Sequence, residues 1–194
     1  MKSFQRRFPM VVIVISLMVV GLIGVYLTIY FSTPMTTKIV KAKLLNVESD
    51  EEQDYWVEQY SLTPKQATDI VDHPGDYKRI MYICELNNDS NIIDLIDIRT
   101  KPDFSNEIEK RALYSSKEFE NYQIQPGQRY WEGIEVLVKM EEGDTPEKLL
   151  DMAKKDRFTI SGRKYLFLSG TPTNAPLTQF PMGSFSLEAK YEGE

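Results

Sequence analysis

Hydrophobic and polar positions divide this chain into one long apolar run and a larger region of mixed composition. The run covers residues 9–31 and holds no charged side chain. At about 1.5 Å per residue, a helix of this length reaches ~35 Å, which is enough to cross a hydrocarbon core of about 30 Å. Pro34 follows and ends the helix. We therefore predict a tail over 1–8, a transmembrane helix over 9–31 and a polar spacer over 32–37.

A removed signal peptide is the alternative explanation for this apolar run. Signal peptides carry about 7–15 apolar residues, fewer than here, and the segment after the run offers no A-x-A-like cleavage site. Lys2, Arg6 and Arg7 precede the run, and the positive-inside rule places such basic tails in the cytoplasm. We predict a retained signal-anchor in the plasma membrane, with the N-terminus cytoplasmic and the C-terminal domain outside.

Alternation of apolar and polar residues predicts several short β-strands in the rest of the chain. These strands cover residues 38–47, 78–87, 92–99, 118–124, 130–140, 157–160, 164–168 and 184–191. In the first strand we expect Val40, Ala42 and Leu44 to face inward. A helix is the alternative for 92–99, but a short Ile-rich run favours a strand, paired with 78–87 in a hairpin. We read Ser161-Gly162 as the turn of a second hairpin.

Helix-capping patterns predict two short helices between these strands. Thr63 precedes Pro64 and starts a helix that runs to Val71, and Asp144 or Thr145 starts another over 145–155. A further helical turn is expected over 106–113. About eight strands with two or three short helices predict a mainly β fold for residues 38–194, namely a β-sandwich with one or two inserted helices.

Two turns give this domain a resemblance to a known family. An inner strand runs into an N-N-x-S turn at 87–90, and a P-G-Q turn at 126–128 precedes a long strand. In both respects about a third of the chain resembles the immunoglobulin-like domains of anchored or exported bacterial proteins. The resemblance implies an immunoglobulin-like β-sandwich architecture, and it implies no functional residue.

Charge and cysteine content narrow the functional classes. Residues 32–194 hold 20 of the 23 basic and all 29 acidic residues, which gives a net charge of −9. An acidic domain is a poor candidate for nucleic-acid binding. Cys84 is the one cysteine, so no internal disulfide can form. This composition suits a domain of a bacterial cell envelope, and no cofactor is expected.

Four aromatic residues are the candidates for contact with a ligand. They are Tyr55, Trp56 and Tyr60, which lie in otherwise polar sequence, and Trp131, which lies in the predicted strand 130–140. Stacking on a sugar or peptide is the functional interpretation, whereas packing over the edge of the core is the structural one. The neighbouring acidic stretch 48–54 lacks the residue spacing and the glycine of a calcium loop, so we expect a solvated loop there.

No catalytic or metal-binding signature is found. A sortase-type transpeptidase would place its cysteine at a strand end, whereas Cys84 lies mid-strand on the inward phase, 11 residues after His73. Glu132 and Glu135 fall on opposite faces of their strand, which argues against a carboxylate pair there. We predict a non-catalytic binding or scaffolding domain whose partners are the membrane and another envelope or membrane protein. The alternative is an anchored envelope hydrolase that uses unidentified carboxylates.

Overall fold

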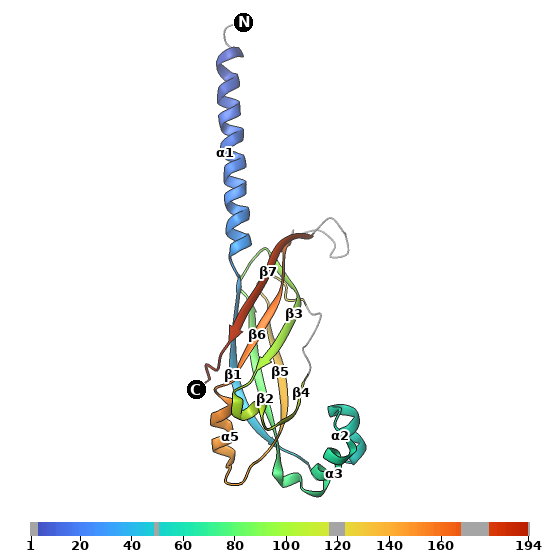
Figure 1. Ribbon diagram of the computed structural model, residues 1–194. Helices are drawn as coiled ribbons and strands as arrows, with labels where there is room; N and C mark the ends of the chain where they lie inside the picture. Colours follow the sequence, from blue (N-terminus) through green and yellow to red (C-terminus); the bar gives the residue numbers. More distant parts are fainter. Residues whose placement is uncertain (1–3, 49–50, 117–122, 168–178, 194) are drawn as a thin grey trace.

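The computed structural model describes residues 4–48, 51–116, 123–167 and 179–193. The apolar helix α1 (Phe4–Phe31) stands on one end of a mainly β domain and continues the long direction of its strands (Figure 1). None of its most apolar window, Met10–Thr28, is buried against the rest of the protein. The helix begins five residues before the predicted span and ends ahead of Pro34, as predicted.

Two antiparallel sheets form the domain. Sheet A has the strand order β1-β2-β5-β4, with β1 (Met35–Asn46), β2 (Tyr77–Asn88), β5 (Arg129–Lys139) and β4 (Ala112–Ser115). Sheet B has the order β3-β6-β7, with β3 (Ile93–Asp103), β6 (Arg157–Phe167) and β7 (Gln179–Ala189). The predicted mainly β, two-layered architecture is therefore confirmed.

Strands β2 and β3 lie in different sheets, so the predicted hairpin between them is wrong. The chain crosses from sheet A to sheet B over residues 89–92, and β3 pairs with β6. The buried amide of Asn88 stabilises this crossing, because it donates to the carbonyl oxygens of Ile93 at 2.6 Å and Ile124 at 2.9 Å. A strand's own alternation gives its buried face but not its partner.

Strand β6 runs without interruption through Ser161 and Gly162, so the second predicted hairpin is also wrong. Gly162 lies opposite Phe185 of β7, and a Cβ atom built on it would lie 2.9 Å from the Phe185 ring and 3.0 Å from the carbonyl oxygen of Ile96. Gly162 therefore leaves room for the Phe185 ring in the middle of the strand, and it does not form a turn.

The inward phase of β1 changes at a β-bulge. The register with β2 shifts between Ile39 and Lys41, so Ile39 and Ala42 are both buried whereas Val40 is not. The prediction that Val40 faces inward is wrong for this reason, and the prediction for Ala42 is confirmed. A bulge adds one residue to one strand and changes the face of every residue on one side of it.

One predicted segment, the strand 118–124, falls largely outside the described residues, which include its Gln123 and Ile124. Ile124 forms a bridge with Leu95 of β3. The helical turn predicted over 106–113 is confirmed as the short helix α4 (Asn106–Glu109), whereas Ala112 and Leu113 begin β4.

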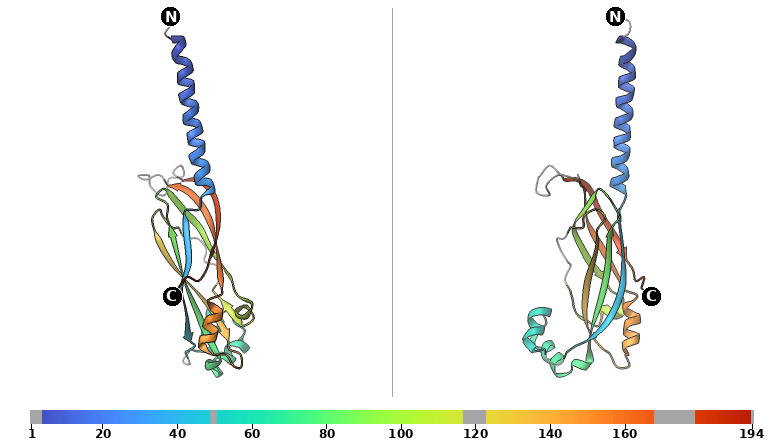
Figure 2. Two further views of the ribbon diagram at one scale, coloured as in Figure 1. Left: turned by 90° about the vertical axis from the view of Figure 1, so that its left-hand side faces the viewer. Right: turned by 180° about the vertical axis from the view of Figure 1, so that it is seen from behind.

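Short helices gather at the end of the domain opposite α1 (Figures 1 and 2). They are α2 (Gln53–Tyr60), α3 (Pro64–Asp72), the 3-10 helix η1 (Pro74–Asp76) and α5 (Pro146–Ala153). Thr63 forms a reciprocal capping box with Gln66, and the Thr145 hydroxyl accepts from the amide of Lys148, so both predicted N-caps are confirmed. Helix α2 was not predicted.

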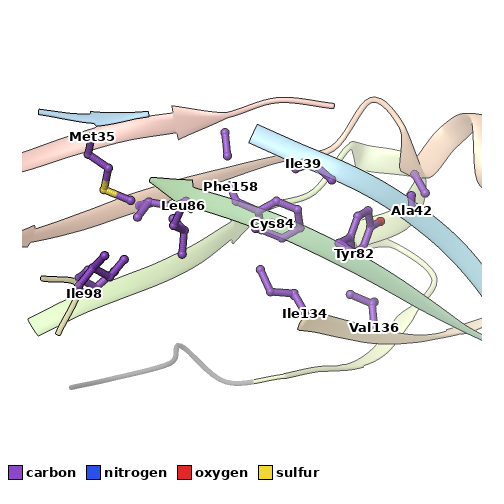
Figure 3. Close-up of a cluster of buried hydrophobic side chains, with 14 of the residues drawn as sticks. Met35, Ile39, Ala42, Tyr82, Cys84, Leu86, Ile98, Ile134, Val136 and Phe158 are labelled. Atoms are coloured by element: carbon purple, nitrogen blue, oxygen red, sulfur yellow. The ribbon is translucent and has the colours of Figure 1, made fainter. Parts of the chain in front are cut away.

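The main core lies between the two sheets (Figure 3). Tyr82, Cys84 and Leu86 of β2 face it in the predicted alternation, together with Ile134 and Val136 of β5. A second cluster lies on the outer face of sheet A under α2 and α3. Its buried members are Val47, Trp56, Tyr60, Leu62, Ala67, Ile70, Tyr77 and Leu137. Strand β5 is therefore buried on both faces at this end.

Candidate functional site

Three of the four candidate aromatics belong to the second cluster. Trp56 is fully buried, Tyr60 is 7 % exposed and Tyr55 packs against both at ring-centroid distances of 5.3 and 5.7 Å. The Tyr60 hydroxyl donates to Oε1 of Glu135 at 2.6 Å, and burial raises the pKa of Tyr60 well above its usual value. These residues hold α2 on sheet A, so Trp56 has no exposed surface for a ligand.

Trp131 is different, because 54 % of it is exposed. It lies on the outer face of sheet A, in the half nearer α1, where α2 and α3 do not cover the strands. Directly opposite it across β2 and β1 lie Glu85 and Lys38. Gly133, two residues further along β5, has open space where a side chain would be.

A polar network holds Trp131 in place. The Arg129 guanidinium lies 5.8 Å from the centre of the indole, and its Nε donates to Oδ1 of Asn87 at 2.9 Å. Asn87 Nδ2 donates to Oε1 of Glu85 at 3.0 Å. That hydrogen bond lowers the pKa of Glu85, and Arg129, Lys38 and Trp131 lower it further. The aromatic ring is therefore positioned by its neighbours rather than by burial.

Basic side chains line the β1 side of the same face. Register with β2 places Lys38 opposite Glu85, Lys41 opposite Ile83 and Lys43 opposite Met81. Because directly paired residues share a face, all three lysines lie on the outer side with Trp131. We call this surface the Trp131 face and define it by Lys38, Lys41, Lys43, Ile83, Glu85, Asn87, Arg129, Trp131 and Gly133.

The Trp131 face continues into a hollow at the edge of β1. The hollow has a volume of about 340 Å³ and is lined partly by Thr36, Lys38 and Asn87. Glu188 and Glu192 lie on its far side, and Glu188 is paired with Arg157 and Lys190. The sequence showed Lys41 and Lys43 as outward residues, but it could not place Trp131 beside them, because nearly ninety positions separate β1 from Trp131.

Specific contacts also hold the junction between α1 and the domain. Lys164 of β6 is buried, and its ammonium donates to the carbonyl oxygens of Tyr30 and Ser32, each at 2.6 Å. Burial lowers the pKa of Lys164. Gly183, at a φ of 100°, leaves room for the Tyr30 ring. The last carbonyl groups of α1 are thus capped by a side chain of the domain.

The cysteine and histidine of the chain lie far apart. Cys84 is fully buried, and burial, with a smaller effect of Glu132, raises the pKa of its thiol to about 12. Tyr77, which lies between the two residues in sequence, is seven strand residues from Cys84, or ~23 Å at about 3.3 Å per residue. His73 lies before it, with Nδ1 3.3 Å from Asp69.

The fold separates Glu132 from Glu135, the two glutamates singled out from the sequence. Glu132 is buried and accepts from the Thr100 hydroxyl at 2.7 Å, whereas Glu135 bonds Tyr60 on the other side of sheet A. Asp94 is buried, and Asp97 lies at a bulge of β3 and pairs with Arg163. Within the described ranges, no cluster of three or more His, Cys, Asp or Glu residues is arranged to hold a metal ion.

Comparisons with known proteins give distant likenesses. No family model matches the chain, and no curated protein matches it. One similar structure is a putative lipoprotein, YcdA, from Bacillus subtilis, at 7 % identity and a TM-score of 0.29. That match covers 80 % of this chain but 37 % of the Bacillus protein, so this chain spans well under half of that protein's length.

Two further structures have similarly low sequence identity and TM-score. The cupredoxin domain of AmoB from Nitrosocaldus yellowstonii has 11 % identity and a TM-score of 0.27, with 81 % of this chain and 90 % of that one covered. A protein from Archaeoglobus fulgidus has 6 % identity and a TM-score of 0.23, with 78 % and 94 % covered. At these values none of the three assigns a function.

Proposed function

We propose that this chain is a single-pass membrane protein of the bacterial cell envelope whose domain lies outside the membrane and binds another envelope component. The role is non-catalytic display: α1 is the retained anchor, and the domain presents a binding surface beside it. The observation that carries the proposal is the Trp131 face, where an exposed, positioned tryptophan lies among basic residues on a domain of net charge −9.

The placement rests on α1 and its junction. Its apolar side chains are exposed along the whole of Met10–Thr28. Such exposure is unfavourable in free energy in water and favourable in lipid. Lys2, Arg6 and Arg7 precede the apolar run, and by the positive-inside rule they favour a cytoplasmic N-terminus. The cap from Lys164 joins the anchor to the domain directly, so the Trp131 face is held at a defined position relative to the membrane.

We also propose that the domain is immunoglobulin-like. Its two sheets, β1-β2-β5-β4 and β3-β6-β7, have the strand order A-B-E-D and C-F-G of constant-type immunoglobulin domains. Helices α2 and α3 are then an insertion between the first two strands, and α5 is an insertion between the fifth and sixth. Proteins with such sandwiches have many unrelated functions. The proposed architecture therefore indicates no function, and the binding role is argued from the Trp131 face alone.

Protease treatment of intact cells, followed by mass measurement, tests the placement. We expect external protease to digest the domain and to leave a fragment that contains α1. We expect the untreated protein to have the mass of the uncleaved chain. A mature N-terminus between Thr33 and Thr37, or a domain protected until the membrane is opened, would contradict the proposal.

Site-specific photocrosslinking tests the binding role in the same cells. A crosslinking side chain at position 133 is accommodated, because the site is open, and it lies beside Trp131. The matched control is position 159, on the outer side of sheet B. We expect an adduct from position 133 only. Equal adducts from both positions, or none from position 133, would remove the Trp131 face as the binding surface.

A further inference from the structure

We infer that the Trp131 face binds a linear anionic glycan, with a sugar ring stacked on Trp131 and acidic groups of the chain beside Lys38, Lys41 and Lys43. This inference rests on the proposed binding function and names the chemistry of the ligand. It replaces the protein partner expected from the sequence with a polysaccharide.

The tryptophan fits a sugar ring. One side of the indole is in contact with Arg129, and 54 % of Trp131 is exposed. The face of an aromatic ring is electron-rich and attracts the polarised C–H groups that line one side of a sugar ring. Glu85 lies directly opposite it on β2 and supplies acceptor oxygens for sugar hydroxyl groups at the rim. Gly133 has no side chain, so the sheet surface next to the indole ring is open to a neighbouring sugar.

The charges fit an anionic polymer. Lys38, Lys41, Lys43 and Arg129 contribute four positive charges to this surface. Among the residues that define it Glu85 is the one carboxylate, and Asn87 and Arg129 already hold it; Glu188 and Glu192 line the adjoining hollow beyond Lys38. The rest of the domain is acidic, so an anionic ligand is attracted to this surface and repelled elsewhere. Lys38 and Lys43 pair with Glu85 and Met81, which are four residues apart on β2, so the lysine row extends for ~13 Å at about 3.3 Å per residue. That length accommodates several linked sugar units.

The direction of the lysine row argues against a lipid surface. The row follows β1, and the strands of the domain run along the direction of α1 (Figures 1 and 2). A flat bilayer around α1 therefore meets one end of the row, whereas a linear polymer can lie along all of it. This geometry favours a linear polymer over lipid headgroups.

The edge of sheet A argues against an extended peptide. Peptides commonly add to a sheet as an extra strand through its free edge. At Ile39 the edge of β1 is already in use, because its amide donates to the carbonyl oxygen of Lys190 and its carbonyl accepts from the amide of Glu192. Recognition here has to use side chains on a sheet face, which suits a flat sugar chain.

Tryptophan fluorescence of the full chain in nanodiscs tests the inference. The protein has two tryptophans, and Trp56 is fully buried, so acrylamide quenches Trp131 selectively. The probes are hexagalacturonate, a heparin hexasaccharide, neutral cellohexaose and polyglutamate. We expect either anionic sugar to protect Trp131 from quenching in a saturable way, and less so when salt rises from about 50 to 300 mM. Neutral sugar and polyglutamate should protect less.

Matched variants separate stacking from charge. Trp131→Ala should weaken binding of the anionic sugar, followed by calorimetry, about tenfold or more. Lys41→Gln together with Lys43→Gln should weaken it and reduce its salt dependence. The controls are Tyr130→Ala, the neighbouring residue on the other face of β5, and Lys101→Gln on sheet B, and both should bind as the parent does. Circular dichroism verifies that each variant is folded.

Three results would overturn the inference. The first is no binding of either anionic sugar. The second is equal binding of polyglutamate that survives Trp131→Ala, which indicates a general affinity for acidic polypeptides. The third is protection of Trp131 by a nanodisc that contains anionic lipid when no sugar is present, which indicates that the face binds lipid headgroups. None of these results decides whether the domain is an anchored binding domain outside the membrane, because the crosslinking and protease experiments test that proposal independently.

Discussion

The ammonium of Lys164 donates a hydrogen bond to the carbonyl oxygen of Tyr30 at 2.6 Å and so joins β6, the central strand of sheet B, to the last turn of α1. The two residues are 134 positions apart in the sequence. The same ammonium bonds the carbonyl oxygen of Ser32, and both carbonyl groups lie at the negative end of the helix dipole. This contact determines how the helix meets the domain.

Replacing Lys164 with methionine should loosen this junction. The aliphatic part of the side chain is kept, but the carbonyl groups of Tyr30 and Ser32 lose their donor, at a cost of about 1–3 kcal/mol. Hydrogen exchange of the amides in 32–36 should become faster, and thermal unfolding should occur at a lower temperature. The exposed Lys190→Met is the control and should change neither measurement. Unchanged exchange in Lys164→Met would show that the contact does not hold the junction.

Replacing Gly162 with alanine should destabilise the domain, because the new methyl group would meet the Phe185 ring and the carbonyl oxygen of Ile96. Overpacking of this kind costs roughly 1–3 kcal/mol. Urea unfolding measures the loss as a lower midpoint at unchanged slope. Gly133→Ala, on the open outer face, is the matched control and should stay within about 0.5 kcal/mol of the parent. Equal midpoints for the two variants would contradict the packing of β6 against β7.

The contribution of Asp69 to stability should depend on pH. Lys139, and then Tyr77, lower the pKa of Asp69 to about 2, so its charge favours the folded state above the pKa of the unfolded chain, about 4. That contribution is lost as pH falls from about 4 towards 2. Asp69→Asn should therefore melt below the parent at pH 7 and like the parent near pH 2. Asp72→Asn, in the same helix, should show no such convergence, and a constant gap for Asp69→Asn would refute the linkage.

Cys84 should be inert in the folded protein. It is fully buried, and its thiol has a pKa raised to about 12, so the reactive thiolate is scarce at neutral pH. A polar thiol reagent should label it only after unfolding in urea. Cys84→Ser should cost about 1–3 kcal/mol, because it buries a hydroxyl group without an arranged partner, and Cys84→Ala should cost less. Rapid labelling of the native protein would contradict this.

Features that depend on neighbouring residues were determined by the sequence alone. The uncharged run predicts α1, because a helix satisfies its own backbone and needs only apolar side chains along its length. Alternation predicts the buried face of β2 from Ile80 to Leu86, because successive strand residues point to opposite sides. Thr63 and Thr145 predict helix starts, because a cap bonds an amide two or three residues away.

Features that depend on distant residues were decided by the tertiary structure. Alternation cannot reveal that β3 pairs with β6 rather than with β2, or that Gly162 lies under Phe185 instead of in a turn. The burial of the two tryptophans likewise does not follow from the local sequence. Trp56 is buried because α2 folds back onto Leu137, and Trp131 is exposed because the helices end before they reach it. Burial is a property of what packs against a residue, and those contacts come from elsewhere in the chain.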